Sequence, residues 1–570
     1  MRPETHYEVQ GLTETGWTVL DTAADEPKAI AAARLRLEDG GLEAVRVTRE
    51  HFNPESNVFR SSVVYEKEGV RKPAYGGGDV AAPCRTMADL ERWEVCQAAN
   101  IAMRELLDGW GMIASEVFFD YATYKRLADQ GGALAGAVTG TIDVMLPNEE
   151  QLLPPRAKAV MPVIKEAAAR LKRVHESGTI PTIQKNDFFA LAIQYEGEED
   201  RLFRMAIAVM RLFRQFDGVE QRLTWLLQRL NPLPAAWSIE LVDRWLAECL
   251  MHRRLLDAFL EGQASCCDRV LILLRMAEGK LEQDSFTGAK VPEALGQRMR
   301  ALHAHLVEGR LPKVRDVLIG RAADILVDRA PLKSGEFLQE LAAAAHIYRA
   351  SVVDRQTRTR HGRLGDILVK RCNRLLHSDA IAQFTEKSLD PYPGLMALLE
   401  LEPIVIGETA KNRLADYMFT IIGPPKRADA LRTGDGNPLN RMRELGQLQK
   451  RLNQSAMPDN VRAKLAEILD QHSAKLLSET NLFKKMQASK EPGFEKVLRL
   501  AKMLCDGYFT EGIASDVARR HVWNFMASRD VIARLIRPPA SEQEKNDVAT
   551  LQKLLAAAGV SGDPVNMSAN

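Results

Sequence analysis

A helical period of apolar residues, broken at short intervals by glycine and proline, runs almost without interruption through residues 156–537. In its most apolar part, residues 199–279, the side chains of Leu202, Ala206 and Val209 begin a series whose spacings alternate between four and three residues. This spacing marks one face of an α-helix. Helices of roughly ten to twenty-five residues fit between the breakers, and short connections make successive helices antiparallel neighbours. The pattern predicts a mainly α chain built around a long antiparallel helical array, either an irregular α-solenoid or a set of stacked helical bundles.

Within residues 199–279, three residues stand where successive helices are expected to stop: Gly218, Pro232 and Gly262. They predict three or four antiparallel helices that bury their apolar faces against one another. We expect this stretch to be the most densely packed part of the array.

The first 68 residues follow a different pattern. Alternation of apolar and polar residues indicates short strands at residues 7–10, 17–20, 42–52 and 61–65. Between the second and third of these, residues 25–39 have an acidic start, an early proline and a stripe of Ala and Leu, which together indicate a helix. The order ββαββ predicts a small α+β module.

Glycine-rich and proline-rich stretches at residues 69–85 and 423–437 predict linkers between domains. We therefore expect a small α+β module at 1–68, a flexible linker at 69–85, a helical array at 86–422, a linker at 423–437, a C-terminal helical domain at 438–537, and a short helix with a disordered tail at 538–570.

Composition narrows the class of protein. The chain has 77 Lys and Arg residues against 76 Asp and Glu residues, so it has no global field that would attract nucleic acid or an anionic membrane. Its seven cysteines are scattered without a CxxC pair, which favours free thiols in a reducing compartment over a disulfide framework. No apolar run is long enough to span a membrane, and the N-terminus lacks the apolar core of a signal peptide. We expect a cytoplasmic protein; the sequence gives no indication of its oligomeric state.

The motifs of common catalytic and metal sites are missing from the sequence. There is no GxSxG, no GxxxxGK[ST] and no complete GxGxxG. His303 and His305 stand two residues apart in an expected helix, so their side chains point to different faces and cannot chelate one metal ion. No two histidines stand four residues apart, which removes a common zinc pattern. The sequence therefore predicts no catalytic residue, no cofactor and no metal site.

Residues 349–374 carry the strongest local charge, because eight Arg and Lys residues there face only two Asp residues. Arginine binds phosphates and carboxylates through paired N–H donors, so this patch is a candidate site for nucleic acid, a nucleotide or an acidic partner surface. Its candidate contact residues are Arg355, Arg358, Arg360, Arg363 and Arg371. The neutral chain and the lack of aromatic residues among these arginines favour a solvated loop whose arginines pair with acidic helices, so nucleic acid is not the expected partner.

A second cationic group surrounds the loop at residues 434–436, which precedes Asn437 and Pro438. Asparagine caps helices and proline fits their first turn, so a helix N-terminus flanked by Arg432 and Arg441 is able to hold an anion. The incomplete phosphate fingerprint favours a surface loop that starts a helix instead.

The hypothesis that best fits these patterns is a non-enzymatic helical scaffold or regulatory protein that binds protein partners, with the N-terminal module used for docking or sensing. Two alternatives stay open. One is an enzyme or a small-ligand or nucleotide sensor, whose pocket lies between helices and draws its polar groups from distant positions. The other is a nucleic-acid binder that uses residues 349–374.

Overall fold

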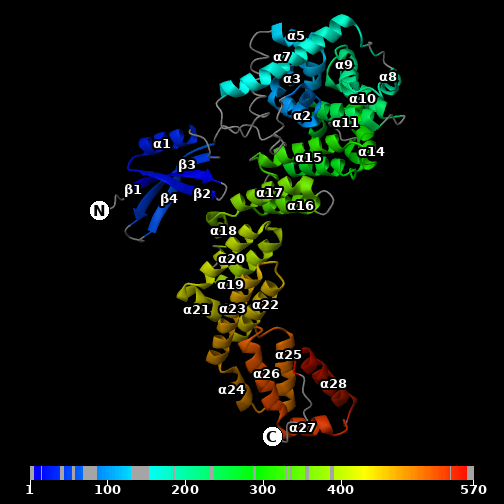
Figure 1. Ribbon diagram of the computed structural model, residues 1–570. Helices are drawn as coiled ribbons and strands as arrows, with labels where there is room; N and C mark the ends of the chain where they lie inside the picture. Colours follow the sequence, from blue (N-terminus) through cyan, green and yellow to red (C-terminus); the bar gives the residue numbers. More distant parts are fainter. Residues whose placement is uncertain are drawn as a thin grey trace. The chain divides into compact units, whose positions relative to one another are not determined.

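The computed structural model divides the chain into two compact units. Unit 1 comprises Met1–Gly335 and His346–Leu368, and unit 2 comprises Glu336–Ala345 and Val369–Asn570. The chain is mainly helical, with one small sheet near the N-terminus, which confirms the predicted fold class (Figure 1). The structure describes all residues except 1–4, 14–15, 39–43, 54–57, 69–85, 130–152, 181–182, 184–186, 232–235, 287–290, 329, 334–336, 353–357, 386–389, 435, 540 and 561–570.

The N-terminal module consists of β1 (Thr5–Thr13), β2 (Gly16–Ala23), α1 (Glu26–Glu38), β3 (Ala44–Asn53) and β4 (Val58–Glu68). The strands form an antiparallel sheet in the order β2-β1-β3-β4, and α1 packs against it (Figure 1). Alternation along the strands places Val9, Val45 and Val47 on the face toward α1, where they are fully buried against Ala29 and Ala33. The predicted order ββαββ is confirmed.

Contacts in unit 1 join helices that are distant in the chain, notably α11 with α15, α13 with α15, and α2 with α11. Their bounds are η1 Met87–Glu91, α2 Trp93–Ala102, α3 Arg104–Trp110, α4 Ala114–Phe119, α5 Tyr121–Asp129, α7 Leu153–Ser177, α8 Phe188–Gln194, α9 Arg201–Phe213, α10 Val219–Leu227, η2 Gln228–Leu230, α11 Ala236–Met251, α12 Arg253–Leu260, α13 Cys266–Ala277, η3 Gln283–Phe286, α14 Glu293–Val307 and α15 Pro312–Val327. Two further helices, α16 (Phe337–Val352) and α17 (Arg358–Leu375), contribute residues to both units.

The described residues of the stretch 199–279 form five α-helices, α9 to α13, so the prediction of three or four was wrong. Gly218 and Gly262 do separate helices, and both have the positive φ (89° and 98°) that glycine adopts most readily. Pro232 lies outside the described residues. The additional break is at His252, whose backbone is extended (φ −68°, ψ 121°) between α11 and α12. Neither glycine nor proline marks this break, so the sequence pattern did not reveal it.

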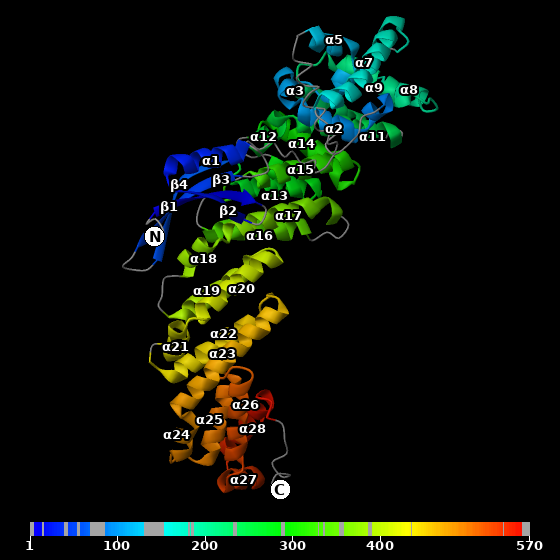
Figure 2. The ribbon, with the colours of Figure 1, turned by 60° about the vertical axis from the view of Figure 1, so that its left-hand side comes forward.

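Unit 2 continues the helical pattern, and Figure 2 shows its helices labelled from α18 to α28. Contacts join α19 to α20 and α22, α22 to α23, α23 to α26, and α25 to α26 and α28. The bounds are α18 Ser378–Thr385, α19 Pro391–Leu401, η4 Glu402–Ile404, α20 Glu408–Ile422, α21 Pro425–Thr433, α22 Pro438–Asn453, α23 Asp459–Thr480, α24 Leu482–Ala488, α25 Gly493–Cys505, α26 Ile513–Met526, α27 Arg529–Ile536 and α28 Glu542–Ala557.

The predicted helix start at Asn437 is confirmed by its cap, because the Asn437 side chain accepts the Leu439 N–H at the start of α22. The short helix predicted within 538–570 is α28, and Ser541 caps it by accepting the Glu544 N–H. The predicted linker at residues 423–437 contains helix α21. The linker at 69–85 and the tail at 561–570 lie outside the described residues. The remaining predicted domain boundaries stay predictions.

Candidate functional site

The break between α11 and α12 presents two adjacent arginines at the start of a helix. Arg253 and Arg254 are the first two residues of α12, and both are exposed. The N-terminus of a helix carries a partial positive charge, so cations there are unfavourable and acidic residues are preferred. The first turn of α12 contains no acidic residue. This local conflict with helix electrostatics is of the kind expected where a residue serves binding rather than stability.

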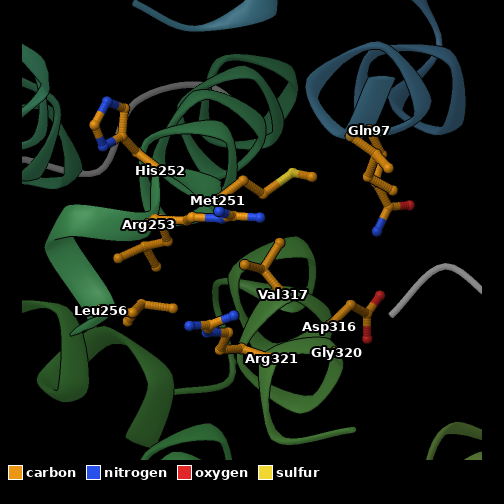
Figure 3. A pocket seen from close by; sticks show the side chains of 11 residues that line it. Gln97, Met251, His252, Arg253, Leu256, Asp316, Val317, Gly320 and Arg321 are labelled. Carbon is orange, nitrogen blue, oxygen red and sulfur yellow. The ribbon is translucent and has the colours of Figure 1, made fainter. Parts of the chain in front are cut away.

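A small pocket lies beside these arginines, between α2, the α11–α12 break and α15 (Figure 3). Its volume is about 20 Å³, room for one or two water molecules. Figure 3 shows the side chains of Arg253 from α12 and Arg321 from α15 reaching toward the same gap, close to Met251 and Val317. The remaining lining residues are Gln97, Ile101, Leu250, His252, Leu256, Asp316 and Gly320. The pocket is thus an apolar recess with guanidinium groups at its side.

An open hollow of about 500 Å³ adjoins the pocket, and the two share Arg321. Its polar lining comes from Arg254, Asp257, Glu261, Arg269 and Arg321, and its apolar lining from Ala258, Leu260 and Ile325. We call the pocket and the hollow together the arginine groove. Within it, Arg321 forms an ion pair with Asp257 at 2.5 Å.

The other arginines of the groove are free of internal partners in the part of the chain that the structure describes. No ion pair or side-chain hydrogen bond involves the guanidinium group of Arg253, Arg254 or Arg269 there. Behind them, burial lowers the pKa of Arg104 to about 9, and the positive charges of Arg253 and Arg321 act in the same direction. Several cations therefore lie close enough to repel one another, and a bound anion would relieve that repulsion.

Asp108 holds the corner at which α12 begins. Its Oδ1 atom lies 3.4 Å from the Arg253 backbone nitrogen, which donates a hydrogen bond to it, and 3.4 Å from His252 Nε2. Burial lowers the pKa of His252, while Asp108 raises it and Arg254 lowers it further. The corner is thus fixed by a carboxylate behind the helix start, and the arginine side chains remain outside it.

A buried polar network fixes α2 and α4 on α11 and thereby sets one wall of the pocket. The Glu248 carboxylate of α11 accepts hydrogen bonds from Ser115 Oγ at 2.6 Å, from the Ser115 backbone N–H at 2.9 Å, and from Asn100 Nδ2 at 3.2 Å. Arg244 Nε lies 3.5 Å from the same carboxylate, and its guanidinium also donates to Cys96 Sγ. Burial raises the pKa of Cys96 to about 12, so this thiol stays protonated.

The opposite wall is fixed by a helix cap. The Asp243 carboxylate of α11 accepts the backbone N–H groups of Lys313 at 2.9 Å and Val314 at 3.1 Å, at the start of α15. This contact fixes the first turn of α15. Further along the same helix, Val317 and Arg321 line the groove. The walls of the groove are thus joined to α11 by hydrogen bonds of two buried carboxylates, Glu248 and Asp243.

None of the arginines predicted as site residues lines the arginine groove. Arg355 lies outside the described residues, and Arg358 and Arg360 lie in α17 without described side chains. Arg363 is half-buried in the part of α17 that belongs to unit 1. Arg371 belongs to unit 2, where it is buried and pairs with Glu340 at 3.5 Å.

The two arginines near the residue 434–436 loop are engaged by carboxylates of unit 2. Arg441 donates to both oxygens of Asp390, at 3.2 and 2.6 Å, and lies 3.1 Å from Glu444. A Cβ atom at Gly434 would lie 1.8 Å from Arg441 Nη2, so a side chain there would displace the Arg441 guanidinium. Arg432 pairs with Glu479 at 3.0 Å and with Asp429.

Sequence reasoning missed the arginine groove. The only available signal was the pair Arg253 and Arg254 directly after His252, in a stretch without a glycine or proline. Nothing in the sequence indicated that α13 and α15 would bring Arg269 and Arg321 to the same surface.

Neither a metal site nor a membrane span was found in the described part of the chain. No group of three or more His, Cys, Asp or Glu side chains there is arranged to hold a metal ion. No helix there is both long and apolar enough to cross a bilayer. Comparison with known proteins finds no match for the chain among family models, curated proteins or solved structures.

Proposed function

We propose that the chain is a non-enzymatic helical scaffold that binds a protein partner, and that the arginine groove is its docking site. The observation that carries this proposal is the combination of an apolar recess and exposed, internally unpaired arginines on one surface. Protein interfaces concentrate their binding energy where an anchor side chain enters a well-packed pocket, and arginine is enriched at such positions.

The dimensions of the pocket favour a protein partner over a small-molecule ligand. Sites for small molecules enclose roughly 300 to 1,000 Å³ and bury most of the ligand. The apolar pocket has about 20 Å³, and the larger part of the groove opens to solvent. A single side chain projecting from a partner's backbone suits this shape, because the rest of the partner can lie along the open hollow.

Site-specific photo-crosslinking in cells of the source organism tests the proposal. A benzophenone amino acid replaces Ala258, which lines the groove, and the matched control carries it at Lys172, an exposed position on α7. We expect a discrete protein adduct from position 258 that is missing at position 172 and is lost when Val317→Trp fills the pocket. A position-258 variant that yields no protein adduct, or the same adducts as the control, would contradict the proposal.

A further inference from the structure

The chemistry of the arginine groove specifies the kind of segment that would bind there. We infer that the partner contributes an acidic segment with an aliphatic anchor: the terminal methyl groups of a Leu, Ile or Val side chain enter the pocket, and neighbouring carboxylates pair with Arg253 and Arg254. This inference rests on the proposed function, since it assumes that a protein segment docks in the groove.

Two of the three unpaired arginines of the groove stand side by side in the sequence next to the pocket, and the third, Arg269, comes from α13. Arg253 and Arg254 lie at the N-terminal end of α12, where the helix dipole adds to their charge, and the buried Arg104 lies nearby. The acidic lining residue Glu261 is the C-cap of α12 and therefore lies at the other end of the helix. Asp257 is already paired with Arg321, and Asp316 of α15 lines the pocket on the side opposite α12. The complementary carboxylates should therefore flank the anchor on the α12 side, next to the pocket.

The apolar lining selects an aliphatic anchor. Ile101, Leu250, Leu256 and Val317 give the pocket branched aliphatic walls, and Met251 is flexible enough to adapt to the shape of the incoming side chain. Each methyl or methylene group that leaves water contributes about 0.8 kcal/mol, so even the tip of such an anchor adds to the affinity of a short segment. Charge-assisted hydrogen bonds to the arginines then add orientation.

Nucleic acid and nucleotides fit the groove less well, although phosphates also bind arginine. Proteins that bind single-stranded nucleic acid combine a basic groove with aromatic side chains on which successive bases stack. His252 is the only ring-bearing residue among those that line the groove in the described chain, and Figure 3 shows its ring on the side away from the gap between Arg253 and Arg321. Phosphate alone would use the arginines but leave the apolar pocket unfilled.

Selection from a displayed library of random twelve-residue peptides on the full-length chain tests the inference. Enriched peptides are synthesised, and their dissociation constants are measured by fluorescence anisotropy at two salt concentrations. We expect enrichment of peptides in which Asp or Glu flanks a Leu, Ile or Val, with affinity that falls as salt rises because the contacts are ionic.

Three variants locate the binding. Arg253→Gln with Arg254→Gln should weaken binding about tenfold or more and reduce its salt dependence, since two charge-assisted contacts are lost. Val317→Trp should weaken binding by a similar factor by filling the pocket; Gln97→Trp, at the pocket rim on α2, serves the same purpose if Val317→Trp does not fold. Arg275→Gln is the matched control, because Arg275 is an exposed arginine on α13 outside the groove lining, and it should bind as the parent does.

The outcomes separate this inference from the proposed function. Enriched peptides without acidic residues that still lose binding with Val317→Trp would overturn the acidic segment while supporting docking in the groove. Displacement of the peptides by a single-stranded RNA oligonucleotide of higher affinity would overturn the inference in favour of nucleic acid. A selection that enriches no peptide, or binding indifferent to all groove variants, would also overturn it. The proposed function itself fails on the crosslinking result at position 258.

Discussion

At the scale of single residues, Asp243 caps a helix although burial disfavours the charged form of its carboxyl. Its carboxylate is 1% exposed and caps the start of α15 by accepting two backbone N–H groups. Burial raises the pKa of Asp243 to about 6, against the opposing effect of those hydrogen bonds and of the Lys313 charge. The cap therefore holds a wall of the arginine groove in place. Because the carboxyl is buried, it ionises only at a higher pH than an exposed Asp does.

This raised pKa predicts a pH dependence with a definite sign. Between about pH 4 and pH 6, folded chains carry the proton on Asp243 while unfolded chains have lost it, so the free energy of unfolding falls as pH rises through this window and levels off above it. The contribution of this group is on the order of 2 to 3 kcal/mol across the window. We expect Asp243→Asn, which cannot ionise, to lack this decline.

The measurement is urea unfolding of both proteins, followed by circular dichroism at pH 4 and pH 7. Other carboxyls with raised pKa values, such as Glu91 and Glu116, titrate in both proteins, so their contribution cancels in the difference. The stability advantage of the parent over Asp243→Asn should be larger at pH 4 than at pH 7. An advantage that is equal at both pH values would show that Asp243 titrates normally.

At the scale of elements, helix α14 approaches its neighbour so closely that one position admits no side chain. A Cβ atom at Gly296 would lie 2.2 Å from the carbonyl oxygen of Phe286, at the end of η3. We expect Gly296→Ala to destabilise the protein by about 1 to 3 kcal/mol, because the backbone must shift to relieve the overlap. The change is measured as a lower midpoint in urea unfolding.

Gly109 in α3 provides the matched control for this substitution. It is exposed, and a Cβ atom there would meet no atom within 4 Å. Since alanine favours helix over glycine by about 1 kcal/mol, Gly109→Ala should raise stability or leave it unchanged. Equal effects of the two substitutions would contradict the packing argument and point to helix propensity alone.

Helix boundaries with a local chemical cause could be predicted from the sequence, and those with a tertiary cause could not. Gly218 and Gly262 end helices through backbone freedom, and Asn437 and Ser541 begin them through side-chain caps. The break at His252 has no such local signal; the buried contact with Asp108 accompanies it, and Asp108 is distant in sequence. The candidate site was not predicted for the same reason, because its residues are also distant from one another in the sequence.

The distribution of arginines along the sequence also failed to predict the arginine groove. Sequence density singled out residues 349–374, but the fold assigns Arg363 and Arg371 to different units. The arginines of the groove come from α12, α13 and α15 and are sparse along the chain. A charge pattern along the sequence measures neighbours in the chain, whereas a binding site depends on neighbours in space.

At the scale of the whole molecule, each of the two units contains a buried carboxylate that joins several helices through hydrogen bonds. In unit 1, Glu248 joins α11 to α2 and α4; in unit 2, the Asp470 carboxylate of α23 accepts the Ile513 N–H at 2.6 Å, the Ala514 N–H at 3.1 Å and the Thr510 hydroxyl at 2.7 Å. Each carboxylate is buried, and each fixes the N-terminus of a helix or a chain of buried donors. Loss of either charge should therefore loosen its own unit.

Hydrogen exchange measured by mass spectrometry on the full chain tests whether the units respond separately. Glu248→Gln leaves the Arg244 guanidinium buried without its carboxylate, a change that costs about 3 to 5 kcal/mol, so exchange should accelerate in α2, α4 and α11. Asp470→Asn should accelerate exchange in α23 and α26 instead. In a helical array each element depends mainly on its nearest neighbours, so each variant should leave the other set of helices at the parent rate. Glu240→Gln, an exposed position on α11 with the same chemical change as Glu248→Gln, should alter neither set, and acceleration throughout the chain by either buried variant would show that the two units unfold as one.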